Sequence, residues 1–141
     1  MAQPRPRMHG VEHGHGGPDV VRIAWESDGA AGAAFVKAMP FSINGVLAVG
    51  NGVLRWYPLA DGTLAGVHCA VGVAPTGSGV TVRLKKNGAS VGTGTIAAGA
   101  FTTTFVPSPA GYVVGDYFTV DVTAVGSTTP GTGLVVQLRV T

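Results

Sequence analysis

Three of the four histidines of the chain lie close together near the N-terminus, at His9, His13 and His15. Imidazole nitrogens bind transition metals such as iron and nickel. His13 and His15 of one chain alone would make a poor metal site. The two histidine side chains could converge if the chain bends at Gly14 or if copies of the chain associate. Three copies around a threefold axis would supply six imidazoles, enough for an octahedral site. The alternative, which we take as the working interpretation, is a polar arm whose histidines bond to the backbone of a partner.

Other residues that could act in catalysis lack the partners or the setting that catalysis needs. His68 precedes the only cysteine, Cys69, and adjacent residues of a strand point to opposite faces. Asp116 and Asp121 are five residues apart, so they would lie on opposite faces of the strand they flank. Ser78, in "PTGSG", lacks the glycine two positions earlier that a nucleophile elbow requires. We therefore predict no catalytic residue, and we expect Cys69 to be a small buried hydrophobic side chain.

A glycine-rich stretch, "GTGTIA" at 92–97, matches the fingerprint of dinucleotide-binding sites in its letters only. That motif binds a pyrophosphate because a helix begins directly after it. Here the surrounding residues alternate like a strand, so no helix is expected to follow. The sequence predicts no bound cofactor.

Charged residues are scarce, at 11% of the 141 residues, against roughly 25% in average proteins. Basic residues gather only at Arg5 with Arg7 and at 83–86, which does not make a broad phosphate-binding face, so we expect no nucleic-acid partner. Surfaces with few charges are usually covered by partners or by copies. We therefore expect a homo-oligomer, with a trimer as one form of it.

The sequence gives limited information about where in the cell the protein is made. A single cysteine excludes an internal disulfide and indicates synthesis in a reducing compartment. The N-terminal residues lack the apolar core of a signal peptide, and we expect no membrane span because no run of about 18 apolar residues occurs.

The first 19 residues are expected to form an extended arm that attaches the chain to a partner. Three prolines and four glycines within residues 1–18 oppose a helix and leave little apolar surface to bury. Ordering such an arm requires a partner surface, to which arginines would add charge-assisted hydrogen bonds. The residues predicted to bind that partner are Arg5, Arg7, His9, His13 and His15.

Residues 20–141 are expected to form an antiparallel β-sandwich or jelly roll. At 20–26, Val21, Ile23 and Trp25 alternate with polar or small residues, which predicts a half-buried strand. Residues 28–39 form either a short helix capped by Asp28 or a loop. The Asn-Gly pairs at 44–45 and 51–52 predict a small meander of hairpins.

Residues 63–141 read as a regular series of strands with no helical pattern between them, which favours the sandwich. A hairpin is expected around Asn87-Gly88. Two alternatives remain open for the segment 101–105. The residues that face inward are Phe101, Thr103 and Phe105, or they are the threonines between them. The other residues predicted to face inward are Ala65, Val67, Cys69, Val71, Val73, Val80, Val82, Leu84, Phe118, Val120, Val122, Leu134, Val136, Leu138 and Val140.

Two stretches carry a resemblance to a known group of proteins. "VHCAVGVAPTGSGVTVRLKKNGASVGT" and "GDYFTVDVTAVGSTTPGTGLVVQLRV" resemble a β-sandwich module of tail and other virion-surface proteins of bacteriophages that infect actinobacteria. The shared features are an "APTG" to "KNG" hairpin and the closing "VGSTTPG" segment. "HGHGGPDVVRIAWE" and "LAVGNGVLRWYP" resemble the lead-in of such proteins, so the resemblance extends over most of the chain.

This resemblance implies a non-enzymatic structural protein that is made in the host cytoplasm and located in the virion. Its partners would be other virion proteins, and its role would be that of a minor tail or receptor-binding component that meets a host-surface glycan, or of a capsid decoration protein. The alternative is a free carbohydrate-binding module. Such modules usually present exposed aromatic rings, whereas Trp25 and Trp56 are expected in the core or at an interface.

Overall fold

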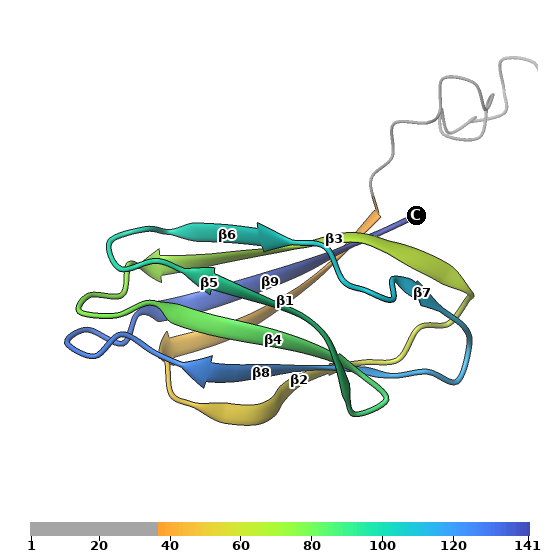
Figure 1. Cartoon of the computed structure of the whole chain (residues 1–141), viewed down its shortest axis with the longest axis horizontal. Helices are drawn as coiled ribbons and strands as arrows, with labels where there is room; N and C mark the ends of the chain where they lie inside the picture. Colours follow the sequence, from red (N-terminus) through yellow and green to blue (C-terminus); the bar gives the residue numbers. More distant parts are fainter. Residues whose placement is uncertain (1–36) are drawn as a thin grey trace, which may run out of the picture. The chain divides into compact units, whose positions relative to one another are not determined.

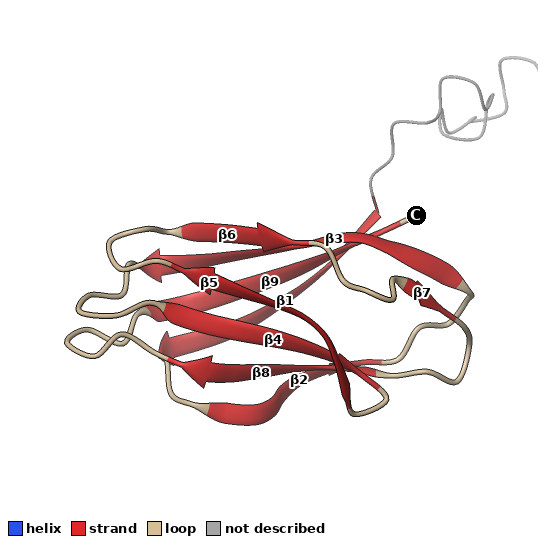
Figure 2. Cartoon of the chain, in the orientation of Figure 1, coloured by secondary structure: helices blue, strands red, loops and turns tan. Residues whose placement is uncertain are grey.

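The computed structural model describes residues 37–141, with side chains from residue 38 onward. This part of the chain consists of strands and loops (Figure 2), and the prediction of an all-β sandwich is confirmed. The strands are β1 (Lys37–Val46), β2 (Gly50–Trp56), β3 (Gly62–Val73), β4 (Val80–Lys86), β5 (Ala89–Ile96), β6 (Thr102–Phe105), β7 (Gly111–Tyr112), β8 (Phe118–Ala124) and β9 (Thr132–Val140). In the described residues, no helix has the length and apolar character needed to cross a membrane.

Some predictions concern residues before this range. The arm at 1–19 and the strand at 20–26 lie outside the described residues, as does most of the helix or loop at 28–39. The last residues of that segment, 37–39, belong to β1. For these residues the prediction of a helix or a loop is wrong, because the chain has already joined a sheet.

Two antiparallel sheets pack face to face (Figure 1). Sheet A has the order β1-β9-β3-β6, with β7 pairing at one end of β3, and sheet B has the order β2-β8-β4-β5. β8 and β9 follow one another in sequence but belong to different sheets, so the "VGSTTPG" segment carries the chain from one layer to the other. On one side the edge strands β5 and β6 lie close together, and on the other side β1 and β2 form the edges.

The predicted alternation of inward side chains is largely confirmed. Val67, Cys69 and Val71 are buried, as are the predicted inward residues of β4 and β8 and most of those of β9. A shift of register between Leu64 and Gly66 puts Leu64 into the core in place of Ala65. The buried apolar residues of the described part of the chain are Leu47, Leu64, Val67, Cys69, Val71, Val80, Val82, Leu84, Val91, Ile96, Tyr112, Phe118, Val120, Val122, Leu134, Val136 and Leu138.

Three further predictions about burial need correction or completion. Val73 has the predicted parity but is 48% exposed, because it lies at the end of β3 beyond the core. Phe101 is also exposed, since it precedes β6. Thr103 and Phe105 are half-buried, and Phe105 packs against the core, so the phenylalanine side of this segment faces inward.

Asn87-Gly88 forms the predicted two-residue turn between β4 and β5. Both residues have positive φ, 50° for Asn87 and 89° for Gly88. A turn with two positive φ values matches the right-handed twist of the flanking strands. Lys86 pairs with Ala89 directly across this turn, so the hairpin prediction is confirmed.

Replacing Gly88 by valine is expected to lower the free energy of unfolding by about 1–3 kcal/mol, because a β-branched residue is strained at positive φ. Urea unfolding of the purified protein measures this loss. The matched control is Gly88→Asn, since asparagine tolerates this conformation, and it should retain most of the stability. An unchanged midpoint for the valine variant would show that the turn is not formed as described.

The other two Asn-Gly pairs do not form the predicted meander, and that prediction is wrong. β1 pairs with β9 and β2 pairs with β8, so the two segments belong to different sheets. Gly45 and Gly52 do have positive φ, at 84° and 61°, but each lies at a shift of register inside its strand pair. Glycine with positive φ is typical of β-bulges as well as of hairpin turns.

The glycines of "GTGTIA" make room for an aromatic ring. A Cβ atom added to Gly92 would lie 2.8 Å from Cδ2 of Phe105, and one added to Gly94 would lie 2.5 Å from its Cδ1. The ring of Phe105 in β6 therefore lies directly over these two positions of β5. Aromatic side chains cover strand glycines in this way in other sheets. The motif thus serves packing between the two sheets.

Gly94→Ala is accordingly expected to lower the free energy of unfolding by about 1–3 kcal/mol through overpacking against Phe105. Gly111→Ala is the control, because a Cβ atom there meets nothing within 4 Å. Thermal unfolding of both variants tests this. Equal melting temperatures for the two would contradict the role assigned to Phe105.

Candidate functional site

Polar side chains gather on the outer face of sheet B, which we call face B. The register places Arg55 of β2 opposite Thr119 of β8, and Thr119 opposite Lys85 of β4. One row further along, Asp121 lies opposite Arg83. The outward residues of this face are Arg55, Tyr57, Thr81, Arg83, Lys85, Ser90, Thr93, Thr95, Tyr117, Thr119, Asp121 and Thr123.

Asp121 is the centre of an ionic network on face B. Its Oδ1 accepts a hydrogen bond of 2.7 Å from the backbone N–H of Gly52. Its Oδ2 lies 2.7 Å from Nζ of Lys85 and accepts a hydrogen bond of 3.2 Å from Nη2 of Arg83. Although the side chain points outward as predicted, it is only 1% exposed, because these groups enclose it. The burial of Thr119, at 6% exposure, was likewise not expected.

The environment of Asp121 favours its charged form. Burial alone would raise its pKa, but the hydrogen bonds from Lys85, Gly52 and Arg83 hold the pKa below the usual value of an aspartate. Both oxygens are engaged, so this carboxylate is poorly placed to accept a proton from a substrate. Its contacts instead connect the bulge of β2 to β4, across β8.

Two tyrosines and an arginine form a second cluster on face B. The ring centroids of Tyr57 and Tyr117 are 5.9 Å apart, with an angle of 40° between the rings. The guanidinium carbon of Arg55 lies 5.3 Å from the centroid of Tyr117, and its Nη1 donates a hydrogen bond of 3.3 Å to the hydroxyl of Tyr57. Tyr57 is 55% exposed. We call Arg55, Tyr57 and Tyr117 the tyrosine–arginine cluster.

The turn at Asn87 fixes the position of Tyr117. The side-chain carbonyl of Asn87 accepts a hydrogen bond of 2.9 Å from the backbone N–H of Tyr117. Its amide group donates one of 2.7 Å to Asp116. Asp116 also accepts the backbone N–H of Val113 and lies 3.2 Å from Nζ of Lys86. The hydrogen bond from Val113, followed by that from Asn87, lowers the pKa of Asp116, and the two aspartates thus have separate sets of partners.

Trp56 anchors the end of β2, between Arg55 and Tyr57 of the cluster. It stacks on Phe118 at 5.5 Å between centroids and meets Tyr112 edge-on at 5.4 Å. Its inward position, which the sequence predicted as core or interface, leaves Arg55 and Tyr57 on the opposite side of the strand. The backbone under the tyrosine–arginine cluster is therefore held by packing on one face of the sheet and by hydrogen bonds at its end.

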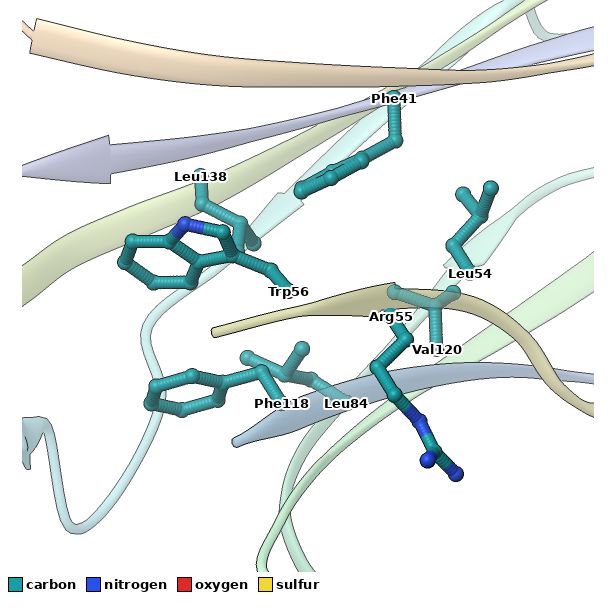
Figure 3. A pocket seen from close by; sticks show the side chains of 8 residues that line it. All are labelled: Phe41, Leu54, Arg55, Trp56, Leu84, Phe118, Val120 and Leu138. Carbon is teal, nitrogen blue, oxygen red and sulfur yellow. The ribbon is translucent and has the colours of Figure 1, made fainter. Parts of the chain in front are cut away.

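The pocket drawn in Figure 3 lies between the sheets on the side where β1 and β2 form the edges. Figure 3 shows the guanidinium of Arg55 pointing away from the apolar side chains. The space between the side chains that line this pocket is too small for a water molecule. The residues that line it are Phe41, Leu54, Arg55, Trp56, Leu84, Phe118, Val120 and Leu138. We interpret it as a gap in the packing of the core.

Cys69 faces the core, as predicted. Burial raises its pKa to about 12, so at neutral pH it remains a thiol that reacts poorly. His68 lies on the other face of β3, half-buried, on the outer face of sheet A. Within residues 37–141, no group of three or more His, Cys, Asp or Glu side chains is placed to hold a metal ion.

The residues predicted to bind a partner or a metal, Arg5, Arg7, His9, His13 and His15, all lie outside the described residues. Their roles stay predictions.

The tyrosine–arginine cluster was not predicted from the sequence, because β2 was expected to pair within a local meander and not with β8. Pairing Arg55 of β2 with Thr119 of β8 would have revealed the cluster.

No known protein-family model matches the chain, and no curated protein matches it either.

Proposed function

We propose that this chain is a non-enzymatic structural protein of a bacteriophage virion. In this proposal residues 1–19 anchor it to the particle, and the β-sandwich is displayed on the surface. The resemblance of residues 67–93 and 115–140 to virion-surface modules supports it. The role would be that of a minor tail or receptor-binding component, or of a capsid decoration protein.

The observation that carries the proposal is the position of the two ends of the described chain. Lys37, where β1 begins, pairs with Val140, at the end of β9. Figure 1 shows these two ends side by side at one end of the sandwich. The loops 47–49, 74–79 and 125–131 are at the opposite end. A domain held at the end where β1 begins would present its faces and its far loops outward.

The outer face of sheet A, which we call face A, is suited to contacts with copies or other virion proteins. Its central row runs from Pro40 through Gln137 and His68 to Thr104. The other outward residues are Ala38, Ser42, Ala70, Thr102, Val135 and Arg139. Among the described side chains of this face, only Arg139 is permanently charged, and protein interfaces are depleted in charge at their centre. We therefore include a homo-oligomer in the proposal, with a trimer as the form to test.

The burial of Cys69 and the enclosure of Asp121 support a non-enzymatic role. The thiol of Cys69 is buried in the core with a pKa of about 12. The carboxylate of Asp121 is enclosed by its own partners. In the described sandwich these groups serve the fold, which accords with a structural protein.

A free carbohydrate-binding module is the second candidate. The observation that favours it is the pair Tyr57 and Tyr117 on one sheet face, because shallow sugar sites use exposed aromatic rings. The two candidates differ in whether the chain belongs to a particle.

Mass spectrometry of purified particles tests the proposal. Particles of the phage that encodes the chain are banded on a density gradient, and the chain is quantified against the major capsid protein. We expect it to band with the particles at a constant ratio, and labelled antibodies then separate a head location from a tail location. A chain that stays in the soluble fraction of the lysate would contradict the proposal and favour the free module.

A further inference from the structure

We infer that face B binds an acidic saccharide, with the tyrosine–arginine cluster as the centre of the site. This deepens the proposed function by naming the chemical class of ligand that the displayed sandwich would meet. It also stands on the geometry of face B alone, since binding can be measured with the isolated chain.

The charge of the described sandwich favours an anionic ligand. Residues 37–141 contain six basic residues and three acidic ones. All three carboxylates already accept hydrogen bonds: Asp61 from the N–H of Val114 at 2.8 Å, and Asp116 and Asp121 as described above. Among residues 37–141, the enclosed Asp121 is the only acidic residue of face B. In this part of the chain, no exposed carboxylate of the face would repel an anion.

Arg55 is the cation best placed to receive that anion. Arg83 and Lys85 are both within 3.2 Å of Asp121, whereas Arg55 forms no ion pair with any described residue. Its contacts among the described residues are the ring of Tyr117 and the hydroxyl of Tyr57, so no carboxylate of residues 37–141 compensates its charge. A guanidinium can hold a carboxylate through two parallel hydrogen bonds.

The aromatic rings beside Arg55 suit a sugar more than an extended peptide. A tyrosine presents an apolar ring with a polar tip, which matches a sugar ring with its C–H face and its hydroxyl groups. Ser90, Thr93 and Thr95 of β5 add exposed hydroxyls to the same face. Because β8 and β4 are internal strands, their backbone groups are paired within the sheet. A peptide added by β-augmentation would pair with an edge strand, β2 or β5, and would lie beside face B and not on it.

A nucleic acid fits face B less well. Arg83 and Lys85 share the charge of Asp121, so the face has few cations with which to follow a phosphate backbone. Affinity for nucleic acids depends mainly on the number of phosphates neutralised. A short acidic group held beside a stacked ring requires only Arg55 and its two tyrosines.

The site is held in place before any ligand arrives. Asn87 fixes the backbone of Tyr117, and Trp56 packs against Phe118 beneath Arg55 and Tyr57. The hydrogen bond from Gly52 to Asp121 holds the bulge of β2. A binding site with little left to order loses less entropy when the ligand binds.

Isothermal titration with polygalacturonate tests the inference, with dextran as a neutral polysaccharide. We expect the full chain to bind polygalacturonate, to bind dextran much more weakly, and to lose affinity as salt is raised. Arg55→Gln and Tyr57→Ala should each weaken binding by about tenfold, the loss of roughly one charged hydrogen bond or one stacked ring. Arg139→Gln removes a charge from face A and is the matched control, for which affinity should not change.

Several results would overturn the inference. They are an absence of binding to polygalacturonate, equal binding to dextran, an equal loss for Arg139→Gln, and tighter binding of single-stranded oligothymidylate or of polyglutamate. Circular dichroism of each variant separates a lost contact from a lost fold. If the chain binds polygalacturonate as expected but is missing from particles, the ligand site is right and the virion role is wrong.

Discussion

Deleting residues 2–17 is expected to leave the sandwich folded and, under the proposed virion role, to abolish incorporation of the chain into the particle. Within residues 37–141, the buried apolar core runs from Leu47 to Leu138, and the deleted segment is rich in glycine, with little apolar surface to bury. The deletion removes Arg5, Arg7 and the three clustered histidines, which are the predicted partner-binding residues. Ordering a glycine-rich segment costs about 1–2 kcal/mol per residue in backbone entropy, so only an extensive partner surface could hold it.

The deletion is tested by complementation, with the truncated gene supplied to a phage that lacks its own copy. Unfolding of the purified truncated chain should give the same midpoint as the full chain, while particles should contain none of it. The control is the full chain with His13→Asn and His15→Asn, which should still be incorporated if the arm binds mainly through its backbone and arginines. Normal incorporation of the truncated chain would show that the arm is not the anchor. Loss of incorporation in the histidine variant, together with loss on adding a chelator, would favour the metal site.

Asp121→Ala is expected to cause the largest loss of stability of any change on face B, about 2–4 kcal/mol in the free energy of unfolding. Removing one partner of a buried ion pair costs about 3–5 kcal/mol. The side chains of Arg83 and Lys85 are 36% and 24% exposed, so water screens part of the interaction and the loss is smaller. The N–H of Gly52 would also lose its acceptor. Thr93→Ala, on the same face and exposed, is the control and should change stability by no more than about 0.5 kcal/mol.

The stabilisation by Asp121 should depend on pH in a defined direction. Its pKa is lower in the folded chain than the ordinary value, which is about 3.9. The contribution is therefore fully present above that value and is lost as the pH falls through the folded-state pKa. Urea unfolding of the wild type and of Asp121→Asn should show a constant difference above about pH 5 and a shrinking one towards pH 2. A difference that grows on acidification would contradict the network.

The alternation of apolar residues was enough to predict the sandwich and most of its core. Val80, Val82 and Leu84 are inward because successive side chains of a strand point to opposite faces. The pattern failed at Ala65, where a bulge shifts the parity by one residue. Such a shift is decided by the neighbouring strands, so local sequence does not reveal it.

The candidate site was beyond prediction because it depends on pairing between distant segments. Asn51-Gly52 has the letters of a hairpin turn, yet the N–H of Gly52 binds the carboxylate of Asp121, 69 residues later in the chain. Tyr117 was expected to face outward, and it does, but its neighbour Tyr57 directly follows β2, a strand that was assigned to another partner. Periodicity gives the face of a residue and not the strand that lies beside it.

Antibody labelling of intact particles tests the central proposal, that the sandwich is displayed on a virion, most directly. Antibodies raised against residues 37–141, coupled to gold, would be applied to purified particles of the phage that encodes the chain and viewed by electron microscopy. The proposal predicts gold at defined positions on intact particles, and none on particles from a deletion of the gene. Intact particles without gold, while the same antibodies detect the chain free in the lysate, would contradict it.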